Sequence, residues 1–203
     1  MIVIIDYGRG NLKSVYNAMK RIGCDVEISS DPIKLQKAKG LILPGVGAFD
    51  DCMNTLENTG LIPVIKEEVK KGKPFLGICL GMQLLFDDGY EGEYTKGLGF
   101  IKGSIKKMEE DNLRIPHIGW NNLEINKEDI LLKGLKNEAY VYYVHSYCAV
   151  DVSDDNLVAY SKYGNIMIPG LVRKDNVMGA QFHPEKSGEE GLVILKNFKE
   201  IVG

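Results

Sequence analysis

A cysteine flanked by glycines is the feature of this sequence that most directly suggests chemistry. Gly77-Ile78-Cys79-Leu80-Gly81 ends an apolar run at residues 75–78 and precedes a predicted helix at residues 82–86. It matches the G-x-nucleophile-x-G elbow, in which a sharp strand-to-helix turn exposes the nucleophile. Side chains at the two glycines would clash with the neighbouring chain, and the helix N-terminus favours a thiolate. The Leu80 N–H is left available to an oxyanion. A buried structural cysteine is the alternative.

A thiolate nucleophile needs a group that carries protons, and one histidine is placed for that task. His183-Pro184-Glu185 follows a predicted strand at residues 177–182. In an extended chain, residues i and i+2 project to the same side, so Glu185 is expected to orient the His183 imidazole as the third member of a triad. Cys79 and His183 both follow strands of a predicted parallel sheet, where ligands collect. A surface His-Pro turn is the alternative.

A glycine-rich loop is the third candidate element. Pro44-Gly45-Val46-Gly47-Ala48 follows a predicted strand at residues 41–43. Its glycines permit peptide orientations that other residues resist. The N–H groups of Val46 and Gly47 are therefore candidates, together with that of Leu80, for an oxyanion hole. A simple tight turn is the alternative.

These residues require a scaffold that brings strand ends together, and the first half of the chain predicts one. Its short apolar runs, each a predicted buried strand, cover residues 2–5, 24–28, 41–43 and 75–78. The amphipathic segments between them are predicted helices at residues 12–22, from Asp31-Pro32 onward, and at 61–71. This alternation favours a parallel sheet with helices on both faces.

From about Gly99 the pattern becomes typical of antiparallel strands. Predicted strands cover residues 100–108, 118–125, 139–144, 157–163, 166–173 and 177–182, and a closing helix carries Leu192, Leu195, Phe198 and Val202 on one face. Because no Pro/Gly/Ser-rich linker separates the halves, we expect one α/β domain over residues 1–203. Its central sheet should be mostly parallel and flanked by helices, with antiparallel strands added in the second half.

Composition argues against several other classes of protein. The 203 residues are 44% hydrophobic and 26% charged, which is typical of a globular domain. A net charge of −3 leaves no basic excess for nucleic acid. The longest apolar stretch, at residues 75–86, is too short for a bilayer. Residues 1–6 lack the basic region of a signal peptide, so a cytoplasmic location is expected.

The remaining cysteine, histidine and charged residues are interpreted as having structural roles. The spacing of the four cysteines and three histidines gives little support to a zinc site. Cys24, Cys52 and Cys148 lack the pair of flanking glycines that Cys79 has two residues before and after it, and they are predicted to be buried. His145 lies in an apolar run and is predicted to be a satisfied, half-buried histidine. The charged run at residues 66–73 is interpreted as a solvated helix face.

Together these features resemble the class I, triad-type glutamine amidotransferases. Gly-Ile-Cys79-Leu-Gly-Met-Gln83 and His183-Pro-Glu185 match the paired signatures of that class. Finer motifs resemble one branch of it, the glutaminase subunits of imidazole glycerol phosphate synthases. These motifs are Asp6-Tyr-Gly-Arg-Gly-Asn-Leu12, Pro44-Gly-Val-Gly-Ala-Phe49, Met82, Pro116-His-Ile-Gly-Trp-Asn121, Tyr142-Tyr-Val-His-Ser-Tyr147 and His183-Pro-Glu-Lys-Ser187.

The resemblance implies a flavodoxin-like fold and a glutaminase. The family hydrolyses L-glutamine to glutamate and ammonia through a thioester, here on Cys79, with His183 and Glu185 completing the triad. Neither a cofactor nor a metal is implied. The glutamine-binding positions of the family correspond to Gly47, Gln83, Glu91, Ser146 and Tyr147, and Glu91 would neutralise the substrate's amino group.

The resemblance also implies a partner. In this branch ammonia passes to a (β/α)₈-barrel cyclase subunit, which makes imidazole glycerol phosphate and AICAR in histidine biosynthesis. The resulting heterodimer would use positions that correspond to Asn11, Trp120, Tyr142 and Lys186, with a core tryptophan as the alternative for Trp120. Glutaminase activity would be low until the cyclase holds its ligand, and rotation of one peptide in residues 44–48 could be the switch.

Three other functions remain open. The first is the glutaminase of another pathway, such as pyridoxal phosphate, anthranilate or GMP synthesis, which the Gly-Trp-Asn and Glu-Lys-Ser signatures disfavour. The second is a stand-alone cysteine hydrolase, such as a γ-glutamyl peptidase, which would turn over peptides without a partner. The third is a non-catalytic flavodoxin-like binding module, which an intact Cys79, His183 and Glu185 disfavour.

Overall fold

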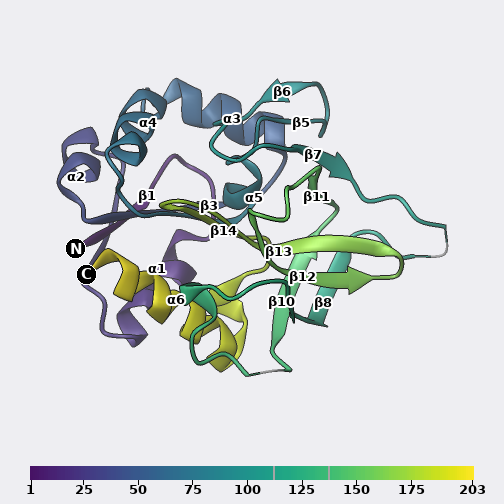
Figure 1. Ribbon diagram of the computed structural model, residues 1–203. Helices are drawn as coiled ribbons and strands as arrows, with labels where there is room; N and C mark the ends of the chain where they lie inside the picture. Colours follow the sequence, from purple (N-terminus) through teal and green to yellow (C-terminus); the bar gives the residue numbers. More distant parts are fainter. Residues whose placement is uncertain (112, 137) are drawn as a thin grey trace.

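An eight-stranded sheet forms the centre of the structure, a computed structural model that describes residues 1–111, 113–136 and 138–203 (Figure 1). Its parallel strands, in spatial order, are β2 (Val26–Ser29), β1 (Ile2–Ile5), β3 (Gly40–Gly45), β4 (Phe75–Cys79) and β14 (Val177–Ala180). Three antiparallel strands continue the sheet: β13 (Ile166–Lys174), β12 (Leu157–Tyr163) and β9 (Glu124–Ile125). The predicted mostly parallel sheet with later antiparallel additions is confirmed.

Helices cover both faces of this sheet. α1 (Leu12–Arg21) and α6 (Gly188–Val202) lie on one face, and α2 (Pro32–Lys37), α3 (Phe49–Asn58) and α4 (Ile62–Lys70) lie on the other (Figure 1). Strand β1 shows how the helices on both faces pack against the sheet. Ile2 and Ile4 belong to the buried cluster with α1 and α6, whereas Val3 and Ile5 belong to the cluster with α2, α3 and α4. Successive strand residues point to opposite faces, so a strand buried on both sides is apolar throughout.

The predicted start of the second helix is confirmed in detail. Asp31 is the N-cap of α2, and its Oδ1 accepts a hydrogen bond of 2.9 Å from the Ile33 N–H. Pro32 occupies the first helical position, where its missing N–H costs nothing. An acidic cap followed by proline therefore fixes where the chain turns into α2.

The second half adds two smaller sheets beside the central one. β8 (His117–Asn122) pairs antiparallel with β10 (Tyr140–His145). The other sheet has the order β11 (Tyr147–Val150), β7 (Ser104–Lys107), β5 (Asp88–Gly89) and β6 (Thr95–Lys96). The described residues also form two 3₁₀ turns, η1 (Ile130–Leu132) and η2 (Pro184–Lys186). β10 and β11 are consecutive in the chain but belong to different sheets, so Ser146 lies at the junction between them.

Several predicted boundaries are wrong. The strand expected at 100–108 is limited to Ser104–Lys107, because the N–H groups of Phe100 and Ile101 both bond to the Leu85 carbonyl and not to a neighbouring strand. The helix expected at 82–86 is α5 (Leu80–Gln83), after which i→i+3 bonds tighten the chain. The last sheet strand ends at Ala180 rather than at residue 182, and the His183 N–H bonds to the Tyr142 carbonyl of β10.

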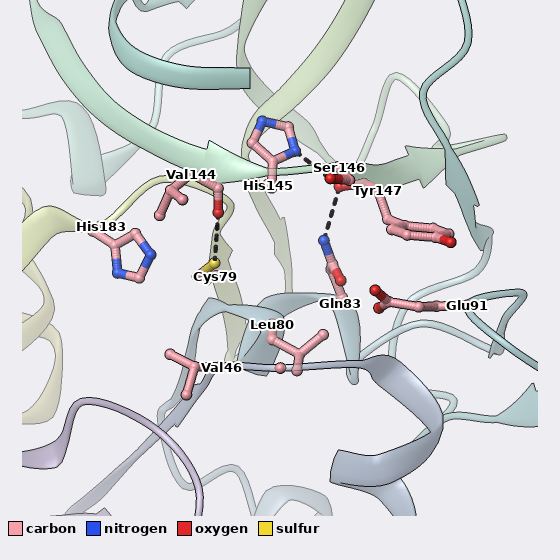
Figure 2. A pocket seen from close by; sticks show the side chains of 11 residues that line it. Val46, Cys79, Leu80, Gln83, Glu91, Val144, His145, Ser146, Tyr147 and His183 are labelled. Carbon is pink, nitrogen blue, oxygen red and sulfur yellow. Dashed lines mark hydrogen bonds between the residues drawn. The ribbon is translucent and has the colours of Figure 1, made fainter. Parts of the chain in front are cut away.

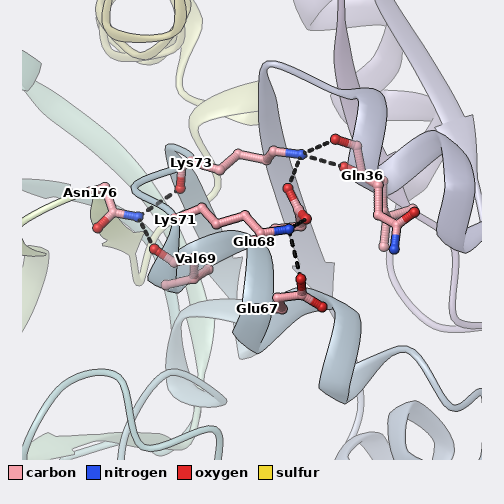
Figure 3. A network of polar contacts seen from close by, with 8 residues as sticks. Gln36, Glu67, Glu68, Val69, Lys71, Lys73 and Asn176 are labelled. Atoms are coloured by element: carbon pink, nitrogen blue, oxygen red, sulfur yellow. Dashed lines mark hydrogen bonds and ion pairs between the residues drawn. The ribbon is translucent and has the colours of Figure 1, made fainter.

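The charged run at residues 66–73 is not simply a solvated helix face, which corrects that interpretation. The Glu68 side chain is only 5% exposed, and its Oε2 lies 2.7 Å from Lys73 Nζ. Lys73 Nζ also donates to the carbonyls of Leu35 and Gln36, each at 2.7 Å (Figure 3). Because those carbonyls lie in the last turn of α2, the ammonium group satisfies helix-end acceptors. The network ties the end of α4 to α2.

Two kinds of feature are absent from the described residues. Within residues 1–111, 113–136 and 138–203, no helix is both long and apolar enough to cross a membrane. Over the same ranges, no group of three or more His, Cys, Asp and Glu side chains is arranged to hold a metal ion.

Candidate active site

Cys79 is held in a strained backbone conformation at the end of β4. Its φ of 54° and ψ of −114° lie in a region that L-residues rarely adopt. The flanking glycines are required, as predicted. A Cβ on Gly77 would lie 2.4 Å from the Gly81 carbonyl oxygen, and one on Gly81 would lie 1.8 Å from the Leu43 carbonyl oxygen. Since α5 has only four residues, its dipole is short, and a charged neighbour must contribute most to any stabilisation of a thiolate.

His183 is that neighbour. Its Nδ1 lies 2.8 Å from Glu185 Oε1, and the two side chains are 4% and 1% exposed. Nε2 is therefore the ring nitrogen that can exchange a proton with the sulfur, and the imidazole and Cys79 face each other in Figure 2. Burial lowers the pKa of His183, but hydrogen bonds and charge from Cys79 and Glu185 outweigh it and raise the pKa to about 10. The local geometry differs from expectation, because Glu185 lies in the turn η2 rather than in an extended chain.

One pocket collects nearly all the catalytic, oxyanion and glutamine-binding residues proposed from the sequence. It has a cavity volume of about 230 Å³. Its lining is Val46, Gly47, Cys79, Leu80, Gln83, Glu91, Val144, His145, Ser146, Tyr147 and His183 (Figure 2). Glu185 lies behind His183 rather than in the lining. Segments separated by more than a hundred residues thus meet beyond the carboxyl ends of β3, β4 and β14.

The glycine-rich loop lies against the elbow. β3 runs to Gly45, two residues further than predicted, and a Cβ on Gly45 would lie 2.6 Å from the Gly81 nitrogen. Gly47 has a φ of +107°, which requires glycine, and open space where a side chain would be. The Val46 carbonyl accepts a hydrogen bond of 3.3 Å from the Cys52 thiol of α3. This contact fixes the orientation of the Val46–Gly47 peptide in the structure.

Gln83 and Glu91 bring two oxygen acceptors to the pocket. Gln83 Nε2 donates to the Tyr147 carbonyl at 2.9 Å and to Gln181 Oε1 at 3.0 Å, so both N–H bonds are used and Oε1 is left for a ligand. Glu91 Oε2 accepts from the Phe49 N–H at 2.9 Å. Burial raises the pKa of Glu91, and the Phe49 N–H opposes that rise. An amide oxygen beside a carboxylate suits a ligand with an ammonium group.

The junction between β10 and β11 forms the opposite wall. Ser146 and Tyr147, both proposed from the sequence, line the pocket together with Val144 and His145, which were not proposed. The Val144 carbonyl lies 3.9 Å from Cys79 Sγ. His145 is only 7% exposed, so it is buried rather than half-buried. The position of these residues depends on cross-strand pairing, which no local motif reveals.

The four residues proposed for a partner interface lie outside the pocket lining. Trp120 is 56% exposed, so it is not a core residue, and its ring centroid lies 6.0 Å from that of Tyr142. Lys186 is exposed on η2. Asn11 caps α1, where its side chain accepts a 3.4 Å hydrogen bond from the Ser14 N–H. Cys24, Cys52 and Cys148 are buried, as predicted.

Comparison with known proteins defines the class. The family model described as "Glutamine amidotransferase class-I" matches residues 3–201, and the chain belongs to this family. A solved structure described as "Crystal structure of glutamine amidotransferase" has the same fold, with a TM-score of 0.78, 21% identity and complete coverage of both chains. "Structure of PurLQS from Thermotoga maritima" also shares the fold, with a TM-score of 0.76, 19% identity and coverage of 100% of this chain and 98% of the other.

Close relatives narrow the comparison to one branch of the class. The chain is 53% identical over 202 residues to "Imidazole glycerol phosphate synthase subunit HisH" of Caldanaerobacter subterraneus subsp. tengcongensis, covering 100% of this chain and 98% of the relative. It is 51% identical over 199 residues to the protein of the same name from Lactococcus lactis subsp. lactis, covering 98% of each chain. The predicted branch of the class is thereby confirmed.

Proposed function

We propose that this chain, acting as one domain over residues 1–203, is the glutaminase subunit of an imidazole glycerol phosphate synthase. It would hydrolyse L-glutamine and deliver ammonia to a cyclase subunit. The observation that carries the proposal is the constellation of a strained cysteine, a histidine of raised pKa and a buried carboxylate at one pocket. High identity along the whole chain to subunits of that synthase supports the choice of pathway.

The proposed reaction uses Cys79 as nucleophile and His183 as proton carrier. His183 takes the thiol proton, and the sulfur attacks the γ-carboxamide carbon of glutamine. His183 then gives a proton to the departing nitrogen, the C–N bond breaks, and ammonia leaves a γ-glutamyl thioester. His183 takes a proton from water as the water oxygen attacks the thioester. The C–S bond then breaks to release glutamate, and His183 returns its proton to the Cys79 sulfur. Glu185 holds the imidazole and stabilises its charged form throughout.

The negative charge that develops on the substrate's carbonyl oxygen must be stabilised by hydrogen-bond donors, and the elbow around Cys79 provides candidates. The Leu80 N–H begins α5, and the first N–H groups of a helix have no partner within it. Val46 and Gly47 supply the other candidate N–H groups from the loop across the elbow. Removing one donor of this kind typically costs about 10²–10³ in rate. Because Gly47 tolerates unusual dihedral angles, rotation in this loop could switch the hole between states.

Recognition of glutamine is assigned to the remaining lining. The carboxylate of Glu91 and Oε1 of Gln83 would accept hydrogen bonds from the substrate's α-ammonium group. Gly47, Ser146 and Tyr147 would contact the substrate through the surrounding backbone. Charge-assisted hydrogen bonds are the stronger ones, so Glu91 should contribute more to affinity than a neutral acceptor.

The partner is proposed to dock on the outer face of the sheet formed by β8 and β10. Ile118, Trp120, Tyr140 and Val144 are exposed there by 58%, 56%, 53% and 36%. Apolar side chains gathered on one face of a two-stranded sheet mark an interaction surface. The same strand β10 contacts Cys79 through the Val144 carbonyl, so the surface adjoins the site where ammonia forms. We propose a (β/α)₈-barrel cyclase as the partner, with Lys186 and Asn11 at the edges.

A partner is also required by the chemistry of the product. Ammonia in neutral water is mostly protonated and loses its nucleophilic lone pair. A docked acceptor site would receive it before protonation.

Reconstitution with a cyclase subunit tests the proposal. The complex should form glutamate, and in the presence of the cyclase substrate it should form imidazole glycerol phosphate from glutamine. The Cys79→Ala complex should make that product only when ammonium salt replaces glutamine. Equal glutamine-dependent rates with and without Cys79 would refute the proposal, and product formation only with an acceptor from another pathway would refute the choice of synthase.

A further inference from the structure

All three histidines of the chain gather around the candidate active site. His183 belongs to the proposed triad, whereas His117 and His145 have no part in the steps above. These two are 3% and 7% exposed and face each other across the β8–β10 pair. His117 Nδ1 lies 3.2 Å from His145 Nε2, and His145 Nδ1 lies 2.8 Å from the Tyr147 carbonyl oxygen. Two buried polar rings are thus linked to the wall of the pocket.

The protons in this chain of contacts can be assigned from the acceptors. A carbonyl oxygen can only accept, so His145 Nδ1 carries a hydrogen. In a neutral ring Nε2 then has none, and it accepts from His117 Nδ1. By the same reasoning His117 Nε2 is an acceptor, and the side-chain NH₂ of Asn121 lies 3.4 Å from it. All donors therefore point one way, from Asn121 to the Tyr147 carbonyl.

Burial keeps the His117 and His145 rings neutral, as this arrangement of hydrogen-bond donors requires. It lowers the pKa of His117 to about 4. It also lowers the pKa of His145 to about 4, where the Tyr147 carbonyl opposes the shift and the charges of His117 and His183 add to it. A second proton on His145 would place two N–H groups against each other and break the contact with His117.

The end of the chain of contacts formed by His117 and Asn121 is held in place. Tyr143 and Tyr163 stack against the His117 ring, with centroid distances of 4.8 and 4.2 Å. The Asn121 NH₂ also donates to the Lys162 carbonyl at 2.9 Å, which anchors it to β12. A buried polar network that is satisfied at each member rigidifies its surroundings.

The Tyr147 carbonyl is where this network meets the ligand pocket. It accepts from both His145 Nδ1 and Gln83 Nε2. Because it can bond only to the NH₂ end of Gln83, it determines that the amide presents its oxygen, not its nitrogen, to a ligand. The orientation of the Tyr147 peptide is thus coupled to the polarity of the site.

We infer that His117 and His145 form a positioning pair that fixes the Tyr147 carbonyl and thereby sets Gln83 as an acceptor for the substrate's ammonium group. The inference rests on the proposed function only in the identity of that ligand. Neither ring is a catalytic residue, since each acts through the Tyr147 carbonyl. The pair determines specificity for a cationic group at this end of the pocket.

The first test reads the protons directly and needs no enzyme activity. In the ¹⁵N-labelled wild-type chain at pH 7, the ring nitrogens of His145 and His117 should both report a neutral imidazole with the hydrogen on Nδ1. In the Asn121→Leu chain His145 should keep that form. A hydrogen on Nε2 of His145, or a charged His145 ring, would overturn the inference whatever the protein catalyses.

The second test is kinetic and uses the complex with a cyclase that carries its ligand. His145→Phe should raise KM for glutamine about three- to tenfold, the change carried by one neutral hydrogen bond, with a smaller effect on kcat. His145→Asn, which restores a donor toward the Tyr147 carbonyl, should recover most of the loss. In a Gln83→Leu background, His145→Phe should change KM less than twofold. Equal effects of His145→Phe in both backgrounds would overturn the inference.

Tyr143→Phe is the matched control. It removes a hydroxyl that lies 2.8 Å from Ser161 Oγ in the same buried region but leaves the ring against His117. This variant should be less stable to heat yet keep the wild-type KM. If it raised KM as much as His145→Phe does, general softening of the region would explain both effects and the inference would fall.

Discussion

The Nδ1 atom of His183 lies 2.8 Å from Oε1 of Glu185, with both side chains almost completely removed from solvent. A carboxylate in that position holds the ring with Nε2 toward the sulfur of Cys79 and stabilises its protonated form. The positive charge of the protonated His183 ring is thus stabilised by the Glu185 carboxylate on one side and by the Cys79 sulfur on the other. Each proton transfer in the proposed reaction depends on this arrangement.

Replacing Glu185 with glutamine should lower kcat for glutamine hydrolysis about 10²–10⁴-fold, because the ring loses its charged partner. KM should change little, since Glu185 does not line the pocket. Steady-state kinetics of the complex would measure both constants, and thermal unfolding would show whether the variant remains folded. A folded variant with wild-type kcat would show that Glu185 has no part in the reaction.

The raised pKa of His183 predicts a change on removal of the sulfur. Burial alone would lower that pKa, and Cys79 and Glu185 together raise it to about 10. In Cys79→Ala one of the two partners that raise the pKa of His183 is lost, so this pKa should fall toward its ordinary value of about 6.5. Titration of the ring by NMR measures it, and Cys148→Ala is the control. A pKa that stays near 10 without the sulfur would argue against a Cys79–His183 pair.

The same shift predicts the direction of a pH effect on stability. The folded-state pKa of His183 lies above its unfolded value, so the stabilisation is fully present below about pH 6.5 and is lost as pH rises through about 10. The difference in unfolding free energy between wild type and His183→Asn should therefore shrink between pH 7 and pH 10. Chemical denaturation at several pH values measures it, and a difference that grows with pH would contradict the assignment.

Substrate affinity should depend on the charge of Glu91. Glu91→Gln keeps an acceptor for the Phe49 N–H but loses the carboxylate, so KM for glutamine should rise about 10–100-fold with a smaller effect on kcat. Because burial raises the pKa of Glu91, the wild-type KM should begin to rise at a higher pH than for an ordinary carboxyl group as the solution is acidified. Glu93→Gln, an exposed neighbour, is the control. An unchanged KM in Glu91→Gln would remove Glu91 from the binding site.

The local part of this site could be predicted from the sequence because its causes are local. The Cys79 elbow needs only five residues and their steric limits, and the carboxylate of Glu185 lies two residues from the ring it orients. The expected extended geometry at Glu185 was wrong because Pro184 begins a 3₁₀ turn. The contact still forms, since the turn also brings the two side chains to the same side.

Features that depend on long-range pairing could not be predicted in the same way. His145 contacts His117 only because β8 and β10 pair in one particular register. The Lys73 side chain is only 9% exposed because α2 ends against it, a fact of packing that a charged run does not reveal. The sequence analysis predicts no helix at the position of α3. Its buried residues nevertheless recur at helical spacing: Phe49, Cys52, Met53 and Leu56. There the signal was present, and only the many polar residues between them obscured it.

The network around Lys73 should contribute to stability. Lys73→Met removes the ammonium group from the Glu68 carboxylate and from two helix-end carbonyls, and should cost about 1.5–3 kcal/mol of unfolding free energy. Hydrogen bonds from Lys71 and Lys73 lower the pKa of Glu68, so this contribution is present above about pH 4.5 and is lost as pH falls through the lowered pKa. Lys66→Met, on the exposed side of α4, should change stability by less than about 0.5 kcal/mol. Equal stabilities of the two variants would show that the network has no net effect.

The exposed face of β8 and β10 should hold the partner. Trp120→Ala should weaken binding of the cyclase about 30-fold, as expected for an interface tryptophan worth about 2 kcal/mol. Ile33→Ala, on α2 at the opposite end of the molecule, removes a side chain of similar exposure and should leave the affinity unchanged (Figure 1). Titration calorimetry measures both. If the two variants bind the cyclase equally well, the partner docks elsewhere.

Modification by a chloroketone analogue of glutamine, followed by peptide mass spectrometry, tests the central claim most directly. Burial raises the pKa of the Cys24, Cys52 and Cys148 thiols, that of Cys148 to about 11, so these three should stay protonated and unreactive at pH 7.5. One adduct is expected, on the peptide that contains Cys79, slowed by excess glutamine and abolished in Cys79→Ala. Modification of another cysteine at the same rate, or an adduct that persists in Cys79→Ala, would contradict the role given to Cys79.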